Sequence, residues 1–251
     1  AAIAALSSIP DLLTLMGKKG PVMVKPSAYL FAGILFAGLL VAACLAPPKA
    51  TKSFAGTKTY IVHGYMAGPD DHWFEWLETR IEAGGGEAVR LTLPQSDDPD
   101  PAEWEKALAD EIGTPDRKTY IVAHSLGSIT VLRYLSGLDD DSELGGLLLV
   151  SGFPGRLPAI PALDAYMDAP FDAGRIRQIA SRRAVISAKD DPIVPHRQSQ
   201  ALAEDIDADF LPAETGGHFL ARDGFDQFPL VLQTLRDMIR NADNEHTPFA
   251  K

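Results

Sequence analysis

Residues 122–127 read VAHSLG, and this hexapeptide decides the fold. The apolar run Thr119–Ala123 is typical of a buried strand, and Ser125–Ser136 has the pattern of a helix. A serine placed between a strand and a helix, with a small residue two positions before it and a glycine two positions after it, is typical of a nucleophile elbow. An ordinary serine that caps a helix is the alternative. Ala123 takes the place of the usual first glycine, and Gly127 is the second.

Two further predicted strands are followed by residues that can activate this serine. A serine hydroxyl is a weak nucleophile, and it needs a base that is held in turn by an acid. Asp191 follows the strand run Ala184–Ser187, and His218 follows the run at Phe210-Leu211. The order serine, aspartate, histidine along the chain is that of the α/β-hydrolases. We therefore expect Ser125, Asp191 and His218 to form a catalytic triad.

Short apolar runs alternate with helical patterns through residues 58–241. This alternation predicts a parallel sheet that is covered by helices on both faces. The first helix is expected to start at Asp70-Asp71. The fold class is therefore α/β, a compact α/β-hydrolase fold of about six mostly parallel strands. The expected strands lie at residues 59–62, 88–93, 119–123, 147–150, 184–187 and 210–211.

The segment Pro154–Ile179 breaks the alternation. It contains Pro154, Pro158, Pro161 and Pro170 and has no strand pattern. Loops of this length inside compact domains are uncommon unless they are functional. We expect a short lid over the site, with an irregular surface connection as the alternative.

The segment HGYM at residues 63–66 follows the first strand run and predicts an oxyanion hole. The backbone N–H groups of Tyr65 and Leu126 are expected to bind the oxyanion that forms during acyl transfer. The side chains that could line the pocket are His63, Met66, His72 and Trp73. Hydrogen bonding that orders the loop is the alternative role of His63, and packing is the alternative role of Trp73.

Four motifs together resemble the YdeN-like serine hydrolases, relatives of the retinoblastoma-binding serine hydrolase. They are HGYxxxPxDHWFxWL (63–77), AHSLG (123–127), DDPIVP (190–195) and GGHF (216–219). The resemblance implies a compact α/β-hydrolase with esterase-type activity, in which the matched Ser125, Asp191 and His218 are catalytic. It also favours Asp191 over Asp190 as the acid, because Asp191 directly precedes Pro-Ile-Val-Pro.

The N-terminal residues have a different composition from the rest of the chain. Residues 28–46 contain no charge, Lys25 precedes them, and VAAC at 41–44 resembles a bacterial lipoprotein processing box. We expect an exported protein that is tethered to the membrane through a lipidated Cys44. The alternatives are an uncleaved transmembrane anchor and a buried helix in which Cys44 is simply a small hydrophobic residue. The expected layout is 1–22 unassigned, 23–46 signal or anchor, 47–57 tether, 58–241 hydrolase domain and 242–251 tail.

Composition excludes several other classes of function. The formal net charge of −11 opposes binding to nucleic acid. The six histidines show no HExxH spacing, so we expect no metal and no organic cofactor. The sequence thus predicts a serine hydrolase that cleaves a small-molecule ester through an acyl-enzyme on Ser125. A thioesterase or peptidase with the same triad is one alternative, and a protein-binding module with a vestigial site is another.

Overall fold

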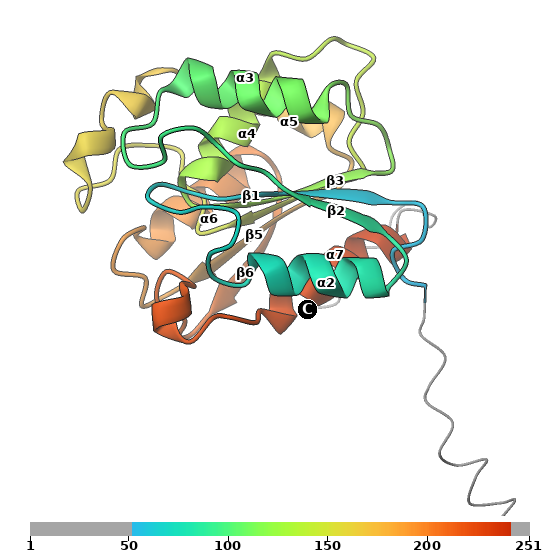
Figure 1. The fold of residues 1–251 in the computed structure, drawn as a ribbon. Helices are drawn as coiled ribbons and strands as arrows, with labels where there is room; N and C mark the ends of the chain where they lie inside the picture. Colours follow the sequence, from blue (N-terminus) through green and yellow to red (C-terminus); the bar gives the residue numbers. More distant parts are fainter. Residues whose placement is uncertain (1–51, 242–251) are drawn as a thin grey trace, which may run out of the picture. The chain divides into compact units, whose positions relative to one another are not determined.

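Residues 52–241 are described by the structure, which is a computed structural model. Their six strands form one sheet in the order β2-β1-β3-β4-β5-β6, and every neighbouring pair is parallel. This confirms the predicted α/β class (Figure 1). The strands are β1 (Lys58–Val62), β2 (Glu87–Arg90), β3 (Thr119–His124), β4 (Gly146–Val150), β5 (Arg183–Ala188) and β6 (Asp209–Ala213).

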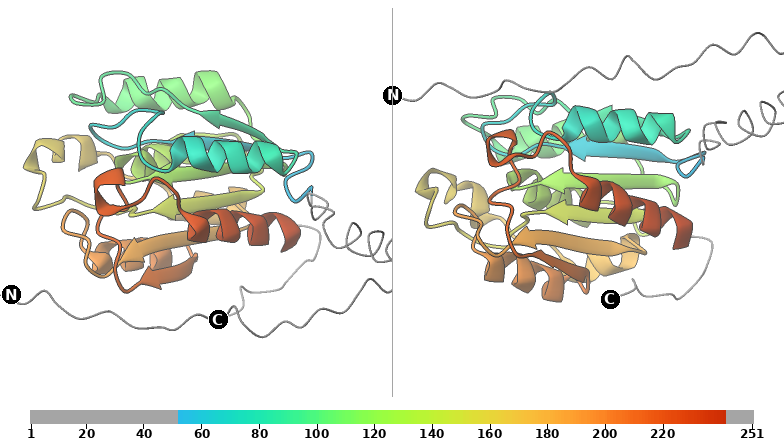
Figure 2. Two further views of the ribbon diagram at one scale, coloured as in Figure 1. Left: turned by 60° about the horizontal axis from the view of Figure 1, so that its bottom comes forward. Right: turned by 90° about the horizontal axis from the view of Figure 1, so that it is seen from below.

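Helices cover both faces of the sheet. Side chains alternate along each strand, so Ile121 and Ala123 of β3 enter one apolar cluster while Tyr120 and Val122 enter the other. The first cluster contains buried side chains from four helices, α3 (Pro101–Ile112), α4 (Leu126–Ser136), α5 (Ala173–Ile179) and α6 (His196–Asp205). The second includes α2 (Phe74–Ala83) and α7 (Pro229–Arg240), which lie on the same face in Figure 2.

The strand order reverses between β1 and β3. The chain runs from β1 outward to β2 and then returns to place β3 on the other side of β1. Loops that leave the carboxyl ends of two such strands diverge, and in open α/β sheets this point is where ligands bind. The loop after β1 starts at His63 and the turn after β3 holds Ser125, so both lie at this point.

Two predicted boundaries were wrong. Helix α2 begins at Phe74 rather than at Asp70-Asp71, because His72 has a φ of 56°, outside the range of a right-handed helix. The Asp71 carboxylate instead accepts a hydrogen bond from Gly68 N–H at 2.7 Å and closes a turn. Strand β2 ends at Arg90, three residues before the predicted end.

The segment predicted to be a lid has little regular structure. It contains the 3₁₀ turns η1 (Pro161–Leu163) and η2 (Tyr166–Asp168) before α5. The Tyr166 hydroxyl lies 2.7 Å from Thr130 Oγ1 of α4, and Arg133 of α4 donates a hydrogen bond to Ala169 O. These contacts fasten the segment to the helix that starts at Ser125.

The expected signal or anchor with Cys44, and the expected tail, lie outside the described residues. Among residues 52–241, none of the helices has both the length and the apolar character that crossing a membrane requires.

Candidate active site

The turn after β3 has the geometry of a nucleophile elbow. Ser125 adopts φ 52° and ψ −123°, which is rare for a residue with a side chain. Its N–H donates to Val150 O at 2.9 Å and so ties the turn to β4. A Cβ on Gly127 would stand 2.3 Å from His63 O. Only glycine therefore allows α4 to start so close to the end of β1.

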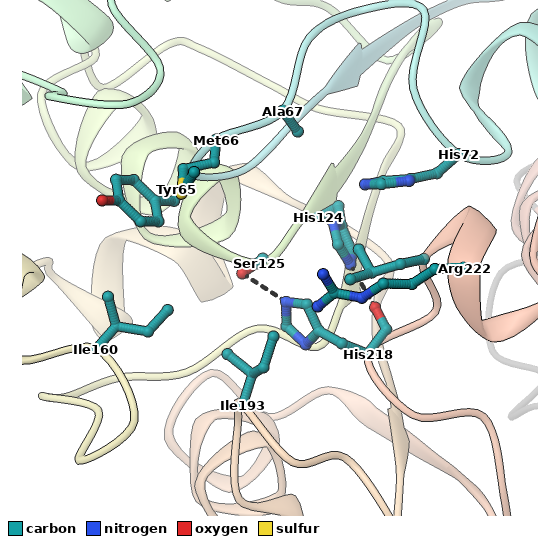
Figure 3. A pocket seen from close by; sticks show the side chains of 11 residues that line it. Tyr65, Met66, Ala67, His72, His124, Ser125, Ile160, Ile193, His218 and Arg222 are labelled. Carbon is teal, nitrogen blue, oxygen red and sulfur yellow. Dashed lines mark hydrogen bonds between the residues drawn. The ribbon is translucent and has the colours of Figure 1, made fainter.

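Ser125, His218 and Asp191 form a continuous chain of hydrogen bonds. Ser125 Oγ lies 2.9 Å from His218 Nε2, and His218 Nδ1 lies 2.8 Å from Asp191 Oδ2 (Figure 3 shows the first of these). A carboxylate can only accept, so the imidazole proton lies on Nδ1 and Nε2 is left to accept from the serine hydroxyl. This is the protonation state in which a histidine can act as the base for a serine.

Asp191 is held by four donors. Its Oδ2 accepts from Ser151 Oγ at 2.9 Å as well as from His218, and its Oδ1 accepts from the N–H groups of Ile193 and Val194 at 2.8 and 3.0 Å. The Asp191 side chain has no exposed surface. Ser151 was not predicted from the sequence. The available signal was its position directly after β4, at the same edge of the sheet as Ser125.

Asp190, the other candidate acid, contacts the histidine loop by a different route. Its Oδ1 accepts from the N–H groups of Gly216 and Gly217, both at 2.9 Å. Neither Ser125 nor His218 is bonded to its carboxylate within the described residues. Asp190 therefore positions the backbone that carries His218, while Asp191 contacts the imidazole.

The histidine loop is also anchored in the core. Asp223 Oδ2 accepts from the N–H groups of His218 and Leu220 at 3.1 and 3.2 Å. Phe219 is buried, and its ring packs against Phe228 at a centroid distance of 4.6 Å. Trp73 donates from Nε1 to Phe219 O at 3.2 Å. Trp73, predicted as a pocket residue, is thus a buried support of the loop.

The loop after β1 lies against the elbow. A Cβ on Gly64 would stand 2.9 Å from Ser125 Cβ, so the two segments are nearly in contact. His63 orders this loop, since its Nδ1–H donates to Gly64 O at 2.9 Å and its Nε2 accepts from Leu93 N–H at 3.1 Å. Burial lowers the pKa of His63, which keeps the ring neutral. The hydrogen bond from Leu93 N–H to His63 Nε2 also links this loop to the backbone just beyond the end of β2.

The two predicted oxyanion donors are adjacent in this arrangement. Leu126 is the first residue of α4, so its N–H has no acceptor within the helix. No group among the described residues accepts from Tyr65 N–H, whereas the next amide, Met66 N–H, donates to Ser96 O at 2.7 Å. Both predicted donors are therefore available to a ligand beside Ser125.

A cavity of about 430 Å³ opens above Ser125 (Figure 3). Of the predicted pocket residues, Met66 and His72 line it, and Met66 is 70% exposed. His63 and Trp73 lie behind the wall, outside the lining. The wall is formed by Tyr65, Met66, Ala67, His72, His124, Ser125, Ile160, Ile193, His218, Leu220 and Arg222.

His124, which directly precedes the serine, was not predicted as a site residue. Its Nε2–H donates to His218 O at 2.9 Å, and the two rings are 4.8 Å apart. Burial, reinforced by the charge of His218, lowers the pKa of His124 well below its usual value. A neutral His124 thus fixes the backbone of His218 without adding a second charge. Within residues 52–241, no group of three His, Cys, Asp or Glu side chains is suited to hold a metal ion.

A parallel sheet with these three side chains at its carboxyl edge defines a serine hydrolase of the α/β-hydrolase fold. The chain belongs to the serine hydrolase family, whose model matches residues 59–237. It is 42% identical to the Bacillus subtilis protein YdeN over 178 residues, which cover 71% of this chain and 94% of that protein.

Further comparisons agree with this family or with its fold. The serine hydrolase RBBP9 of Rattus norvegicus is 25% identical over 190 residues, covering 74% of this chain and 97% of that protein. The crystal structure of the B. subtilis ydeN gene product superimposes with a TM-score of 0.72 at 41% identity, over 73% of this chain and 99% of that one. Est1E from Butyrivibrio proteoclasticus shares the fold. Its TM-score is 0.59 at 14% identity, over 76% of this chain and 91% of its own.

Proposed function

We propose that this chain hydrolyses carboxylic esters through an acyl-enzyme on Ser125. The observation that carries the proposal is the continuous hydrogen-bond chain from Ser125 through His218 to the buried Asp191. His218 takes the serine proton through Nε2 as Ser125 Oγ attacks the ester carbonyl. Asp191 keeps the ring in the required tautomer and stabilises the imidazolium that forms.

The tetrahedral intermediate needs donors for its negative oxygen. We assign this role to the N–H groups of Tyr65 and Leu126, which are next to Ser125 and free of competing acceptors in the described structure. When the intermediate collapses, His218 gives its proton to the leaving oxygen. A water molecule activated by the same imidazole then releases the acid and restores Ser125.

The cavity wall supports a small ester as the substrate. Beside the triad it is mainly apolar, with Met66, Ile160, Ile193 and Leu220 exposed to the ligand space. A thioester or an amide would use the same residues. A binding module with a vestigial site would have no need for a base whose tautomer and orientation are fixed by an acid that three other donors hold in place.

The bond preference is tested with one acyl group on three leaving atoms. We expect 4-nitrophenyl butyrate to be cleaved with a higher kcat/KM than the matching S-4-nitrophenyl thiobutyrate and 4-nitroanilide, each relative to its uncatalysed rate. Labelling by a fluorophosphonate probe reports independently that the serine is activated. Preferred cleavage of the thioester or the anilide would assign the chain to the corresponding alternative, and absence of both turnover and labelling would favour the binding module.

For the N-terminal segment we propose lipidation at Cys44 and attachment to a membrane. The support is the uncharged stretch 28–46 with the chain's one cysteine in VAAC at its end. Expression in a bacterial host with the native N-terminus should give a mature chain that begins at a lipid-modified Cys44, detected by intact mass. Cys44→Ser should block this maturation without loss of hydrolysis in detergent. An unmodified, full-length N-terminus would instead favour an uncleaved anchor.

A further inference from the structure

Arg222 gives the cavity above Ser125 a charge that the proposed mechanism does not use. It lies in the 3₁₀ turn η3 (Ala221–Asp223) and lines the cavity together with Ser125 and His218 (Figure 3). Among the lining residues it is the single lysine or arginine, and no aspartate or glutamate is among them. The cavity wall therefore carries one permanent positive charge, and no carboxylate lines the cavity.

The Arg222 guanidinium has no partner within residues 52–241. Most other arginines in this range donate to a carboxylate or to a backbone carbonyl. Arg222 does not, although the chain has a net charge of −11 and offers many carboxylates. The paired ones are Arg90, Arg117, Arg133, Arg156, Arg175, Arg177, Arg182, Arg183 and Arg240. Arg222 thus presents a planar set of donors to the cavity, a geometry suited to a carboxylate or a phosphate.

The backbone under Arg222 is fixed relative to His218. The neighbouring Asp223 carboxylate binds the N–H of His218, as described above, and Ala221 N–H donates to His72 Nδ1 at 3.2 Å. Gly224, with φ 92°, ends the turn. The long arginine side chain therefore starts from a constant position beside the imidazole, which reduces the entropy lost when it binds an anion.

The position of Arg222 assigns it to one side of the scissile bond. The protonated His218 must reach the leaving atom, so the leaving group lies on the His218 side of Ser125. Arg222 lies on that side in Figure 3, whereas Tyr65, Met66 and Ile160 lie across Ser125 from it. An anion bound by Arg222 would therefore belong to the leaving alcohol, and an apolar acyl chain would face the opposite wall.

We propose that Arg222 is a specificity residue which binds an anionic group on the leaving alcohol of the ester. The inference rests on the proposed esterase function and narrows its substrate class. The bond that breaks is the one between the acyl carbon and the alcohol oxygen. That oxygen receives the proton of His218, the acyl group is transferred to Ser125 Oγ, and Arg222 releases the anionic alcohol.

The test uses two pairs of esters that differ in charge on the alcohol. One pair is 3-carboxy-4-nitrophenyl butyrate and 4-nitrophenyl butyrate, and the other is the butyrate ester of glycerol phosphate and glycerol monobutyrate. For each pair the measured quantity is the ratio of kcat/KM, anionic over neutral. We expect Arg222→Gln to lower this ratio about tenfold, as loss of a charge-assisted hydrogen bond predicts, and Arg222→Glu to lower it further. A drop in the first pair identifies a carboxylate subsite, and a drop in the second a phosphate subsite.

Arg197→Gln is the matched control, because this substitution removes the same charge at a residue that is exposed on α6 and does not line the cavity. Its ratios should equal those of the wild type. Equal ratios in wild type and Arg222→Gln for both pairs, with the neutral esters still cleaved, would overturn the assignment of Arg222 alone. If the wild type cleaved none of the four esters, the esterase proposal would be overturned instead.

Discussion

Ser125→Ala is expected to lower kcat for ester hydrolysis by about 10⁶-fold, the order of the loss seen when a bacterial serine protease loses its nucleophile. The variant keeps the Cβ and removes only the hydroxyl that lies 2.9 Å from His218 Nε2. The positive φ of Ser125 is as unfavourable for alanine as for serine, so the fold should persist. The measurements are kcat on 4-nitrophenyl butyrate, fluorophosphonate labelling, and the circular dichroism spectrum.

Ser128→Ala provides the matched control for this experiment. Ser128 lies in the first turn of α4, three residues after Ser125, and is fully buried. Its hydroxyl is directed to Ala123 O at 3.4 Å rather than to the imidazole. It should retain turnover and labelling. Persistent labelling of Ser125→Ala, with its mass verified, would show that another residue is the nucleophile.

Asp191→Asn is expected to cost about 10⁴-fold in kcat, as the corresponding change does in a serine protease. The amides of Ile193 and Val194 require an acceptor at Oδ1, so the asparagine oxygen should take that position and its NH₂ group should face His218. That donor would force the imidazole into the tautomer with its proton on Nε2. The base would then be unable to accept the proton of Ser125.

Asp190→Asn is the control one residue away. Its Oδ1 accepts from Gly216 and Gly217 N–H, and an asparagine oxygen can do the same, so we expect a small loss of activity. The contrast is measured as kcat at a pH where the wild type is fully active. If Asp190→Asn proved to be the more damaging change, the acid would be assigned to the wrong member of the pair.

Most of the sheet could be predicted from the sequence because the inner strands contain apolar runs, whereas the edge strands β2 and β6 are only partly apolar. The runs at 147–150 and 184–187 lie within fully parallel strands of the sheet, and such buried strands carry a strong local signal. The serine, aspartate and histidine could be placed because each directly follows a strand, and the carboxyl ends of parallel strands meet at one edge. The structure brings these three residues within hydrogen-bond distance.

The remaining features depend on contacts between distant segments. The position of Ser151 after β4 places it at the edge of the sheet that holds the site, but no local pattern identifies its acceptor, a carboxylate 40 residues further along the chain. His124 binds a carbonyl 94 residues away for the same kind of reason. The start of α2 was misplaced because Asp70-Asp71 has the composition of a helix start, while the left-handed backbone of His72 follows from its packing in the fold.

Phe219 gives the site a property that bears on how new substrate preferences can arise. Because the ring of Phe219 is held in the core beside Phe228 and its carbonyl is held by Trp73, the adjacent His218 moves with the core and not with a surface loop. The residues that shape the far side of the cavity, Met66 and Ile160, belong to other segments. Substitutions of Met66 or Ile160 can change the shape of the cavity while His218 stays within hydrogen-bond distance of Ser125. On the side of the cavity formed by Met66 and Ile160, selectivity can therefore change without a change in the chemistry, whereas Arg222 lies in the turn that also holds His218.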